Sequence, residues 1–348
     1  MRKRKLEKDV NLNSVSRKIQ DALYSAKVAI HNKLPKKKIR SAKSGKMREF
    51  WFFHLLWAIP MLQFLLIYVF VNFQSILLAF QTYDKMTGEF VFGGGLGNFR
   101  RVFSEIASPT APLGYALKNS FTVYWVGLLI TTPLALFFSF YMFKKLRFTE
   151  FFRTVLFVPS ILSPVILTSI FYILMNTGMA SLMESVTGIA DEKYYLMAYT
   201  NDATRFPLVI AFGVITGFGT NVLMYTNAMS QIDESVIEAA ELDGASFLRE
   251  FTAICLPLIY PTITTFLTVG IVGFFTNQAN LFSFFKGDAE LEDYTLGYYL
   301  FKLVASKDSM IEEFPFASAM GMVFSAVAIP ITLFMRWALE KFGPQTEL

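Results

Sequence analysis

The residues with the most distinctive chemistry lie in a polar stretch, 231–257, between two long apolar runs. Its first part is rich in carboxylates and alanines and is followed by Gly244. Asp233 or Ser235 can cap a short helix that carries Glu238, and Gly244 can end that helix by adopting the left-handed conformation. A small acidic projection of this kind suits docking into a groove on another protein.

A second short helix is expected to follow the first, over residues 245–254. Pro257 then marks the start of the next apolar run, because proline is tolerated in the first turn of a helix. Ala239 and Ala240 make one side of the first helix small, and Glu238 makes another side acidic. The stretch therefore predicts a helix-turn-helix that projects from an apolar body.

Residues for redox, metal or nucleotide chemistry are scarce in this chain. The single cysteine, Cys255, cannot form an intrachain disulfide, and two histidines, His31 and His54, leave little for a Cys/His metal site. The pair Gly45-Lys46 lacks the upstream glycine and the following hydroxyl residue of a phosphate-binding loop. We expect no catalytic residue, no metal site and no cofactor in this chain.

Two apolar runs carry polar residues at helical spacing that could bind a polar solute. Amides, hydroxyls and aromatic faces are the groups that would bind such a solute, and polar residues inside apolar spans are often functional. The candidates are Gly217, Thr220 and Asn221 in one run, and Gly273, Phe274, Thr276 and Asn277 in the next. The alternative is that these residues only hold helices together, as Gly, Thr and Asn commonly do in membranes.

The body that must position these residues is too apolar for a soluble domain. Of 348 residues, 54% are hydrophobic and 16% are aromatic, and the mean hydropathy is +0.44. A bilayer core of about 30 Å is crossed by about 20 helical residues, and the chain has six sufficiently long runs without charge. We expect an all-α integral membrane protein with six transmembrane helices, at about 51–80, 119–143, 154–176, 206–229, 258–280 and 315–336.

Basic residues predict the orientation of these spans, because they favour the cytoplasmic side. Half of the 32 Lys and Arg residues lie within residues 1–48. Four more follow the second span, namely Lys144, Lys145, Arg147 and Arg153. The loop between the fifth and sixth spans is acidic, which fits the outside, whereas Arg100 and Arg101 fit less well. We expect both termini, the 231–257 loop and the 343–348 tail in the cytoplasm.

Residues 1–48 form a basic arm ahead of the first span. They do not read as a cleavable signal, because the first apolar run is too long and begins too late. Within the arm, residues 15–34 place apolar side chains at nearly helical spacing. We expect an arm that is solvated or lies on anionic lipid, with a regulatory partner site as the alternative.

The 231–257 stretch resembles the hallmark of the permease subunits of ATP-binding-cassette importers. That hallmark is Glu-Ala-Ala, three residues, Gly, nine residues, Ile, one residue and Leu-Pro. The matching positions are Glu238, Ala239, Ala240, Gly244, Ile254, Leu256 and Pro257. The longer form, with Asp243, Ala245, Ser246 and Phe251, is similar to the carbohydrate-uptake branch in particular.

Other stretches refine this resemblance. The surroundings of Phe73 and Tyr83, and the later pair Tyr294-Thr295, resemble the F-type permeases of the maltose and multiple-sugar family more than the G-type permeases with which these pair. The large extracytoplasmic insertion of the enterobacterial maltose permease is absent from this sequence. Contacts made through that insertion therefore cannot be carried over.

The resemblance implies a type I importer fold, in which residues 49–342 form the transmembrane permease domain. It implies that 231–257 forms coupling helices that dock on an ATP-hydrolysing subunit, with Glu238 as the electrostatic contact and Gly244 as the turn. The implied partners are a second permease subunit in a heterodimer, two ATPase subunits that bind ATP and Mg²⁺, an extracellular solute-binding protein, membrane lipids and a carbohydrate, but no nucleic acid. The chain itself would be a transport subunit and not an enzyme.

Two other functions stay open. The same architecture could import an amino acid, phosphate or peptide, although an anion would suit an intramembrane Arg or Lys, and the expected spans contain none. A membrane-embedded enzyme or scaffold is the more remote alternative. An enzyme would need a pair of Asp, Glu, His or Cys residues inside the membrane, whereas His54 and Cys255 lie far apart near opposite span ends.

Overall fold

The computed structural model describes Ser25 and residues 42–93, 95–191, 194–197, 201–306 and 310–344. The chain divides into two compact units, Met1–Val71 and Asn72–Leu348. Among the described residues, five helices are long and apolar enough to cross a membrane, or six when one bent pair counts as a single span. The segment 15–34, with its nearly helical spacing of apolar residues, lies outside the described residues, Ser25 excepted.

The described part of the first unit is one long helix. It comprises α2 (Ala42–Gln63) and a π-helical stretch, η1 (Phe64–Val69), and α3 (Phe70–Leu78) continues it into the second unit. The candidate span Glu49–Leu78 has no charged residue after Glu49, and no side chain in its most apolar window is buried. A helix suits such a run because its backbone groups pair within the segment when no water is present.

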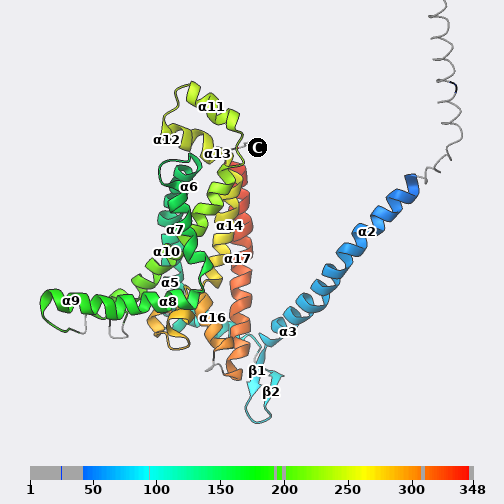
Figure 1. The fold of residues 1–348 in the computed structure, drawn as a ribbon. Coiled ribbons are helices and arrows are strands. Elements are labelled where there is room, and N and C mark those ends of the chain that lie inside the picture. Colours follow the sequence, from blue (N-terminus) through cyan, green and yellow to red (C-terminus); the bar gives the residue numbers. More distant parts are fainter. Residues whose placement is uncertain are drawn as a thin grey trace, which may run out of the picture. The chain divides into compact units, whose positions relative to one another are not determined.

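The second unit contains a bundle of helices that run side by side in Figure 1. Its members are α5 (Pro112–Val126), η2 (Gly127–Thr131) and α6 (Thr132–Phe143) in one span, then α7 (Thr149–Ile161), α10 (Asp202–Met229), α14 (Tyr260–Thr276) and α17 (Phe314–Phe342). Helix α10 packs on α6 and α7, and α14 packs on α5 and α17. Gly219 permits the close approach of α10 to α7, because a Cβ there would lie 2.1 Å from the Leu156 carbonyl oxygen.

The helix expected at 154–176 is two helices in the structure. Helix α7 ends at Ile161, and α8 (Pro164–Ile173), η3 (Leu174–Gly178) and α9 (Met179–Thr187) then run across the end of the bundle in Figure 1. The break has a local cause, because the ring of Pro164 disfavours the helical conformation at Ser163, which is extended at φ −60° and ψ 132°. Helix α7 alone spans about 20 Å at 1.5 Å per residue.

The fifth expected span, 258–280, also differs from expectation at both ends. A longer helix replaces the one expected at 245–254, and it consists of α12 (Phe247–Glu250), η5 (Phe251–Cys255) and α13 (Leu256–Leu258). It meets α14 at a bend of 70°. Pro261 lies in the first turn of α14, where a missing N–H costs little. The helix then ends at Thr276, and Ala279 and Asn280 have positive φ angles of 48° and 58°.

A hairpin and several short helices surround one end of the bundle, which we call the hairpin end. Strands β1 (Gln81–Asp84) and β2 (Glu89–Phe92) pair antiparallel, with Gln81 opposite Phe92. The short helices are α4 (Gly97–Ala107), α15 (Leu281–Phe285), η6 (Leu291–Asp293), α16 (Leu296–Ala305) and η7 (Ile311–Glu313). The hairpin was not predicted from the sequence, and it adds a small sheet to an otherwise helical fold.

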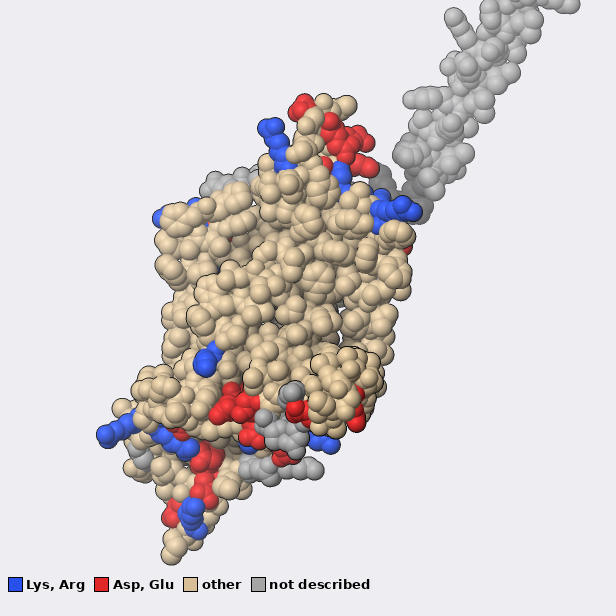
Figure 2. Space-filling model, turned by 90° about the vertical axis from the view of Figure 1, so that its left-hand side faces the viewer, with Lys and Arg blue, Asp and Glu red and all other residues tan. Residues whose placement is uncertain are grey.

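Two hydrophobic clusters hold the second unit together, one toward each end of the bundle. Leu113, Leu296 and Phe316 belong to the cluster at the hairpin end. Phe140 and Met229 belong to the cluster at the opposite end. On the face drawn in Figure 2, charged side chains gather at the two ends and the surface between them is nearly uncharged. This distribution suits a bundle whose middle lies in lipid.

Candidate docking site and cavity

The 231–257 stretch forms a projecting pair of helices, as the sequence predicts. We call residues 233–250 the knob, and the end of the bundle that carries it the knob end. Helix α11 (Glu234–Leu242) begins after Asp233, whose carboxylate accepts a hydrogen bond of 2.9 Å from the Ser235 N–H. The side-chain and backbone hydrogen bonds of Ser235 lower the pKa of Asp233, which therefore stays ionised as a helix cap.

Gly244 closes α11 in the predicted left-handed conformation, at φ +75°. The Ala245 N–H donates to the Ala240 carbonyl at 2.9 Å, and the Gly244 N–H donates to the Glu241 carbonyl at 3.0 Å. These two bonds form a Schellman motif, in which a residue without a Cβ is strongly preferred at the left-handed position. Ser246 caps the next helix by accepting a 3.4 Å hydrogen bond from the Arg249 N–H.

The knob has one buried face and one exposed face. Ile237 and Ala240 are buried, and Ile237 belongs to the hydrophobic cluster at the knob end. Glu238 is exposed, and Leu242 is 89% exposed at the end of α11. Ala239, Asp243 and Gly244 are also exposed, whereas Ile254, Leu256 and Pro257 are partly buried. The predicted contact residues thus separate into an exposed group on α11 and a packed group that leads into α14.

Lys144 ties the knob to the bundle, a contact that the sequence did not predict. It follows α6 directly, and its ammonium lies 2.5 Å from the Glu241 carboxylate and 2.9 Å from the Glu250 carboxylate. Glu250 is 3% exposed, so Lys144 pairs with a buried carboxylate. Burial lowers the pKa of Lys144, but hydrogen bonds to Glu241 and Glu250 outweigh it and leave the pKa above its ordinary value. The lysine is therefore charged at neutral pH.

A cavity of about 560 Å³ lies within the second unit. Its walls come from α5, η2 and the start of α6 on one side and from α10 and α14 on others. Tyr124, Tyr225, Phe266 and Phe274 supply aromatic surface. The rings of Tyr124 and Phe274 are nearly perpendicular, with centroids 6.0 Å apart. Amide and hydroxyl groups complete the lining, which is the mixture that hydroxylated solutes require.

Most of the predicted path residues line this cavity. Gly217, Asn221, Gly273, Phe274 and Asn277 do so. Thr220 and Thr276 lie outside the lining and are exposed, and the Thr276 hydroxyl bonds to the carbonyl one turn earlier in its own helix. Sequence reasoning missed the contribution of the second span, including Tyr124, Thr131 and Thr132. Their positions in an apolar run gave no periodic signal that would separate them from packing residues.

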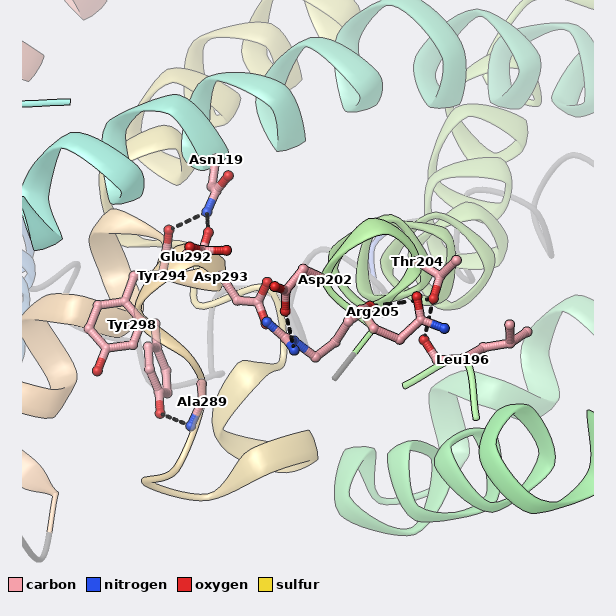
Figure 3. Close-up of polar contacts among 11 residues, drawn as sticks. Asn119, Leu196, Asp202, Thr204, Arg205, Ala289, Glu292, Asp293, Tyr294 and Tyr298 are labelled. Carbon is pink, nitrogen blue, oxygen red and sulfur yellow. Dashed lines mark hydrogen bonds and ion pairs between the residues drawn. The ribbon is translucent and has the colours of Figure 1, made fainter. Parts of the chain in front are cut away.

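A buried ion pair fixes the hairpin end of the cavity. Arg205, which is 1% exposed, donates to the buried Asp293 carboxylate and lies 2.9 Å from Asp202 (Figure 3). Beside it, the Asn119 amide donates to the Glu292 carbonyl at 2.6 Å and to the Tyr294 carbonyl at 3.0 Å. These contacts hold the segment around η6 against α5 and α10.

We expect Arg205→Met to destabilise the protein by about 3–5 kcal/mol, because the Asp293 carboxylate would stay buried without its cation. The double variant Arg205→Met/Asp293→Leu should recover most of that loss, since an apolar pair can replace a buried ion pair at little cost. Thermal unfolding of the purified protein in detergent measures both effects. A single variant that unfolds at the wild-type temperature would contradict this role.

Arg101, which seemed out of place among the acidic residues of this end, is paired there. Its guanidinium lies 2.8 Å from Glu313 and 3.2 Å from Glu105. It also sits over the Phe316 ring, 3.9 Å from the centroid. The basic residue therefore neutralises local carboxylates, and its presence does not conflict with the predicted orientation.

Residues 131–346 match the family described as binding-protein-dependent transport system inner membrane component. This range holds α6, α10, the knob, α14 and α17. The chain belongs to this family. It is thus an inner-membrane permease component, as the resemblance of the 231–257 stretch implied.

Three curated relatives of this permease, all from Bacillus subtilis (strain 168), are transport proteins by name. The probable ABC transporter permease protein YesP is 28% identical over 265 residues, which cover 75% of this chain and 81% of YesP. The polygalacturonan/rhamnogalacturonan transport system permease protein YteP is 26% identical over 81% of this chain and 86% of its own length. The arabinooligosaccharides transport system permease protein AraP is 23% identical over 78% and 83%, respectively.

Solved structures share the fold of this permease. A crystal structure of a bacterial ABC transporter involved in import of the acidic polysaccharide alginate matches with a TM-score of 0.65 at 19% identity, covering 86% of this chain and 98% of that chain. The alginate transporter in complex with its alginate pentasaccharide-bound periplasmic protein matches with a TM-score of 0.66 at 19% identity, covering 87% and 99%. The prediction of a type I importer permease fold is confirmed.

Proposed function

We propose that this permease is one of two membrane-spanning subunits of an ATP-binding-cassette importer, and that its knob couples the cavity to ATP hydrolysis on separate subunits. The observation that carries this proposal is the continuity between the two sites. The knob is capped at both ends of α11, and it continues through α12 and α13, across the bend at Ile259, into α14. Because α14 also lines the cavity, a movement of the knob can change the shape of the cavity.

We propose the following arrangement of this importer. Lys144 contacts the knob, and Lys145 and Arg147 follow it within three residues, which supports placing the knob end and both termini in the cytoplasm. Two ATPase subunits with ATP and Mg²⁺ would then bind at the knob, and an extracellular solute-binding protein would deliver solute at the hairpin end. The second permease subunit would complete the path, most simply as a heterodimer.

The proposed solute is a sugar or oligosaccharide. Relatives named for arabinooligosaccharides and for polygalacturonan/rhamnogalacturonan support this class, as does the amide, hydroxyl and aromatic lining of the cavity. The competing solute is an anion, because a relative in Shigella flexneri is an sn-glycerol-3-phosphate transport system permease protein, UgpA, and because the polygalacturonan in the name of YteP consists of uronic acids. Within the described residues, the cavity lining contains no Lys, Arg, Asp or Glu. The lining therefore favours an uncharged saccharide over a phosphorylated or acidic solute.

The solute class can be tested on the reconstituted importer, assembled by co-expression with the partner permease, the ATPase subunits and the binding protein. Neutral oligosaccharides are expected to stimulate ATP hydrolysis, whereas uronic-acid oligosaccharides of equal length and glycerol-3-phosphate are not. Binding of each solute to the isolated binding protein is measured in parallel, so that selection by that protein is separated from selection by the cavity. Stimulation by the charged solutes alone would overturn the proposed substrate.

A further inference from the structure

Lys144 occupies a junction between elements that are distant in sequence. Its backbone N–H donates to the Phe140 carbonyl at 3.0 Å and so completes the last turn of α6. Its ammonium contacts Glu241 at the end of α11 and Glu250 at the end of α12, 97 and 106 positions away. One side chain thus joins the cavity-lining span to both helices of the knob.

We infer that Lys144 is a positioning residue that sets the angle of the knob against α6 and transfers the movement of the knob to the wall of the cavity. The inference rests on the proposed function, and it concerns a residue outside the 231–257 stretch. The wall in question is the span that ends at Lys144, since Tyr124, Thr131 and Thr132 on that span all line the cavity. A knob linked only through α14 would move the opposite wall alone.

Aromatic packing below the lysine makes this link stiff. The Phe140 ring lies 4.7 Å from the Phe247 ring and 5.2 Å from the Phe251 ring, measured between centroids. Phe137, one turn earlier on α6, meets both rings edge-on at 6.2 Å and 5.9 Å. Such packing resists compression but permits one element to slide or rotate on another. The ion pairs of Lys144 add the directional contact that fixes the angle.

The two carboxylates have different roles in this bridge. Glu250 is buried, and its pair with Lys144 anchors α12 to α6. Glu241 is 57% exposed, and its 2.5 Å contact with Lys144 holds α11. An exposed ion pair adds little to stability, so loss of the Glu241 contact should leave the fold intact. This difference allows the positioning role to be separated from a structural one.

The experiment follows the cavity wall directly and needs no solute. Thr132→Cys places a reporter on the wall of the complete importer, and its rate of modification by N-ethylmaleimide is measured with and without ATP plus vanadate. Cys255 is buried, and a chain without the reporter gives the background. The bridge is weakened in two ways, by Glu241→Gln and by Lys144→Met/Glu250→Met, which removes the lysine and the buried carboxylate together so that neither is left without the other.

In the importer with an unaltered bridge, the rate at which N-ethylmaleimide modifies the reporter is expected to change when nucleotide binds. Lys144→Arg should preserve that change. Both weakened bridges should lose this change, so that the ratio of the modification rates with and without nucleotide is about one. The ATPase subunits should still copurify, because the knob docks but no longer moves the cavity wall. The control Glu340→Gln removes a carboxylate as exposed as that of Glu241, which pairs with Arg336 within a single helix, and should respond as wild type.

The inference is overturned if both Glu241→Gln and the assembled Lys144→Met/Glu250→Met variant keep the wild-type ratio of modification rates. It is also overturned if both weakened bridges lose the ATPase subunits, because the bridge would then act in docking. Failure of the proposed function gives a different pattern. In that case the wild-type chain itself shows no nucleotide response and retains no ATPase subunit.

Discussion

Glu238→Lys is expected to abolish solute uptake while the protein still folds and inserts. Glu238 is exposed on α11 and makes no side-chain hydrogen bond or ion pair within the described residues, so its replacement removes no internal contact. If the knob docks against a basic residue, the reversed charge places like charges together, which costs several kcal/mol. Uptake should fall by at least about tenfold, since 1.4 kcal/mol corresponds to a factor of ten. Uptake by membrane vesicles, normalised to the amount of inserted chain, measures this.

The turn of the knob offers a second route to the same result. Gly244→Pro cannot adopt the φ of +75° that the Schellman motif requires, because proline fixes φ near −65°. The matched control is Glu340→Lys, which reverses an exposed carboxylate that pairs with Arg336 in the same helix, α17. Equal uptake by Glu238→Lys, Gly244→Pro and wild type would remove the docking role from the knob.

Gly273→Phe is expected to block transport without preventing assembly. Gly273 lines the cavity, and nothing lies within 4 Å of the position that its Cβ would occupy. A large side chain can therefore enter the open space and displace solute without forcing the backbone apart. Solute uptake should fall by at least about tenfold, a cost of 1.4 kcal/mol or more, whereas basal ATP hydrolysis should persist.

Thr220→Phe is the control for this prediction. Thr220 was also expected to line the path, but it is exposed and lies outside the cavity on α10. A phenylalanine there adds the same bulk on a neighbouring wall helix and should leave uptake unchanged. If Gly273→Phe transports at the wild-type rate, or if both variants lose transport equally, the cavity is not the solute path.

The features that the sequence predicted well are those that neighbouring residues determine. The capped helix, the left-handed glycine and the second cap of the knob all lie within a short segment, so local side-chain and backbone chemistry is enough to predict them. The helical nature of the charge-free runs followed for the same reason, because each run must satisfy its own backbone in lipid. Glu238 and Gly244 were placed correctly, although their contact with an ATPase subunit stays a prediction.

The helix boundaries were predicted wrongly because the spans were defined by their lack of charge, without regard to the effect of proline on the backbone. The run after Thr154 is continuously apolar, yet Ser163-Pro164 divides it into α7 and α8. A proline at the start of a new helix was a visible signal for this break. The hairpin at 81–92 was missed because strands of four residues carry too short an alternation to stand out beside a long apolar helix.

The contacts that connect the sites could not be predicted from local pattern. Lys144 was assigned only to orientation, because nothing near it in sequence indicates Glu250 as its partner. Arg205 stood just before an expected span, and its burial with Asp293 depends on a pairing across 88 positions. The cavity likewise draws Tyr124 from one span and Phe274 from another. Such pairings follow from the packing of the bundle and require the structure.

The central claim is that the knob contacts an ATP-hydrolysing subunit in the cytoplasm. Leu242, which is 89% exposed on α11, is the most accessible apolar side chain of the knob and accepts a cysteine without loss of packing. In the assembled importer, Leu242→Cys is predicted to crosslink to the ATPase subunit through a short thiol-specific reagent, and to be shielded from a membrane-impermeant maleimide added outside intact cells. Ready labelling from outside, or the absence of any crosslink to an ATPase subunit in the purified complex, would contradict it.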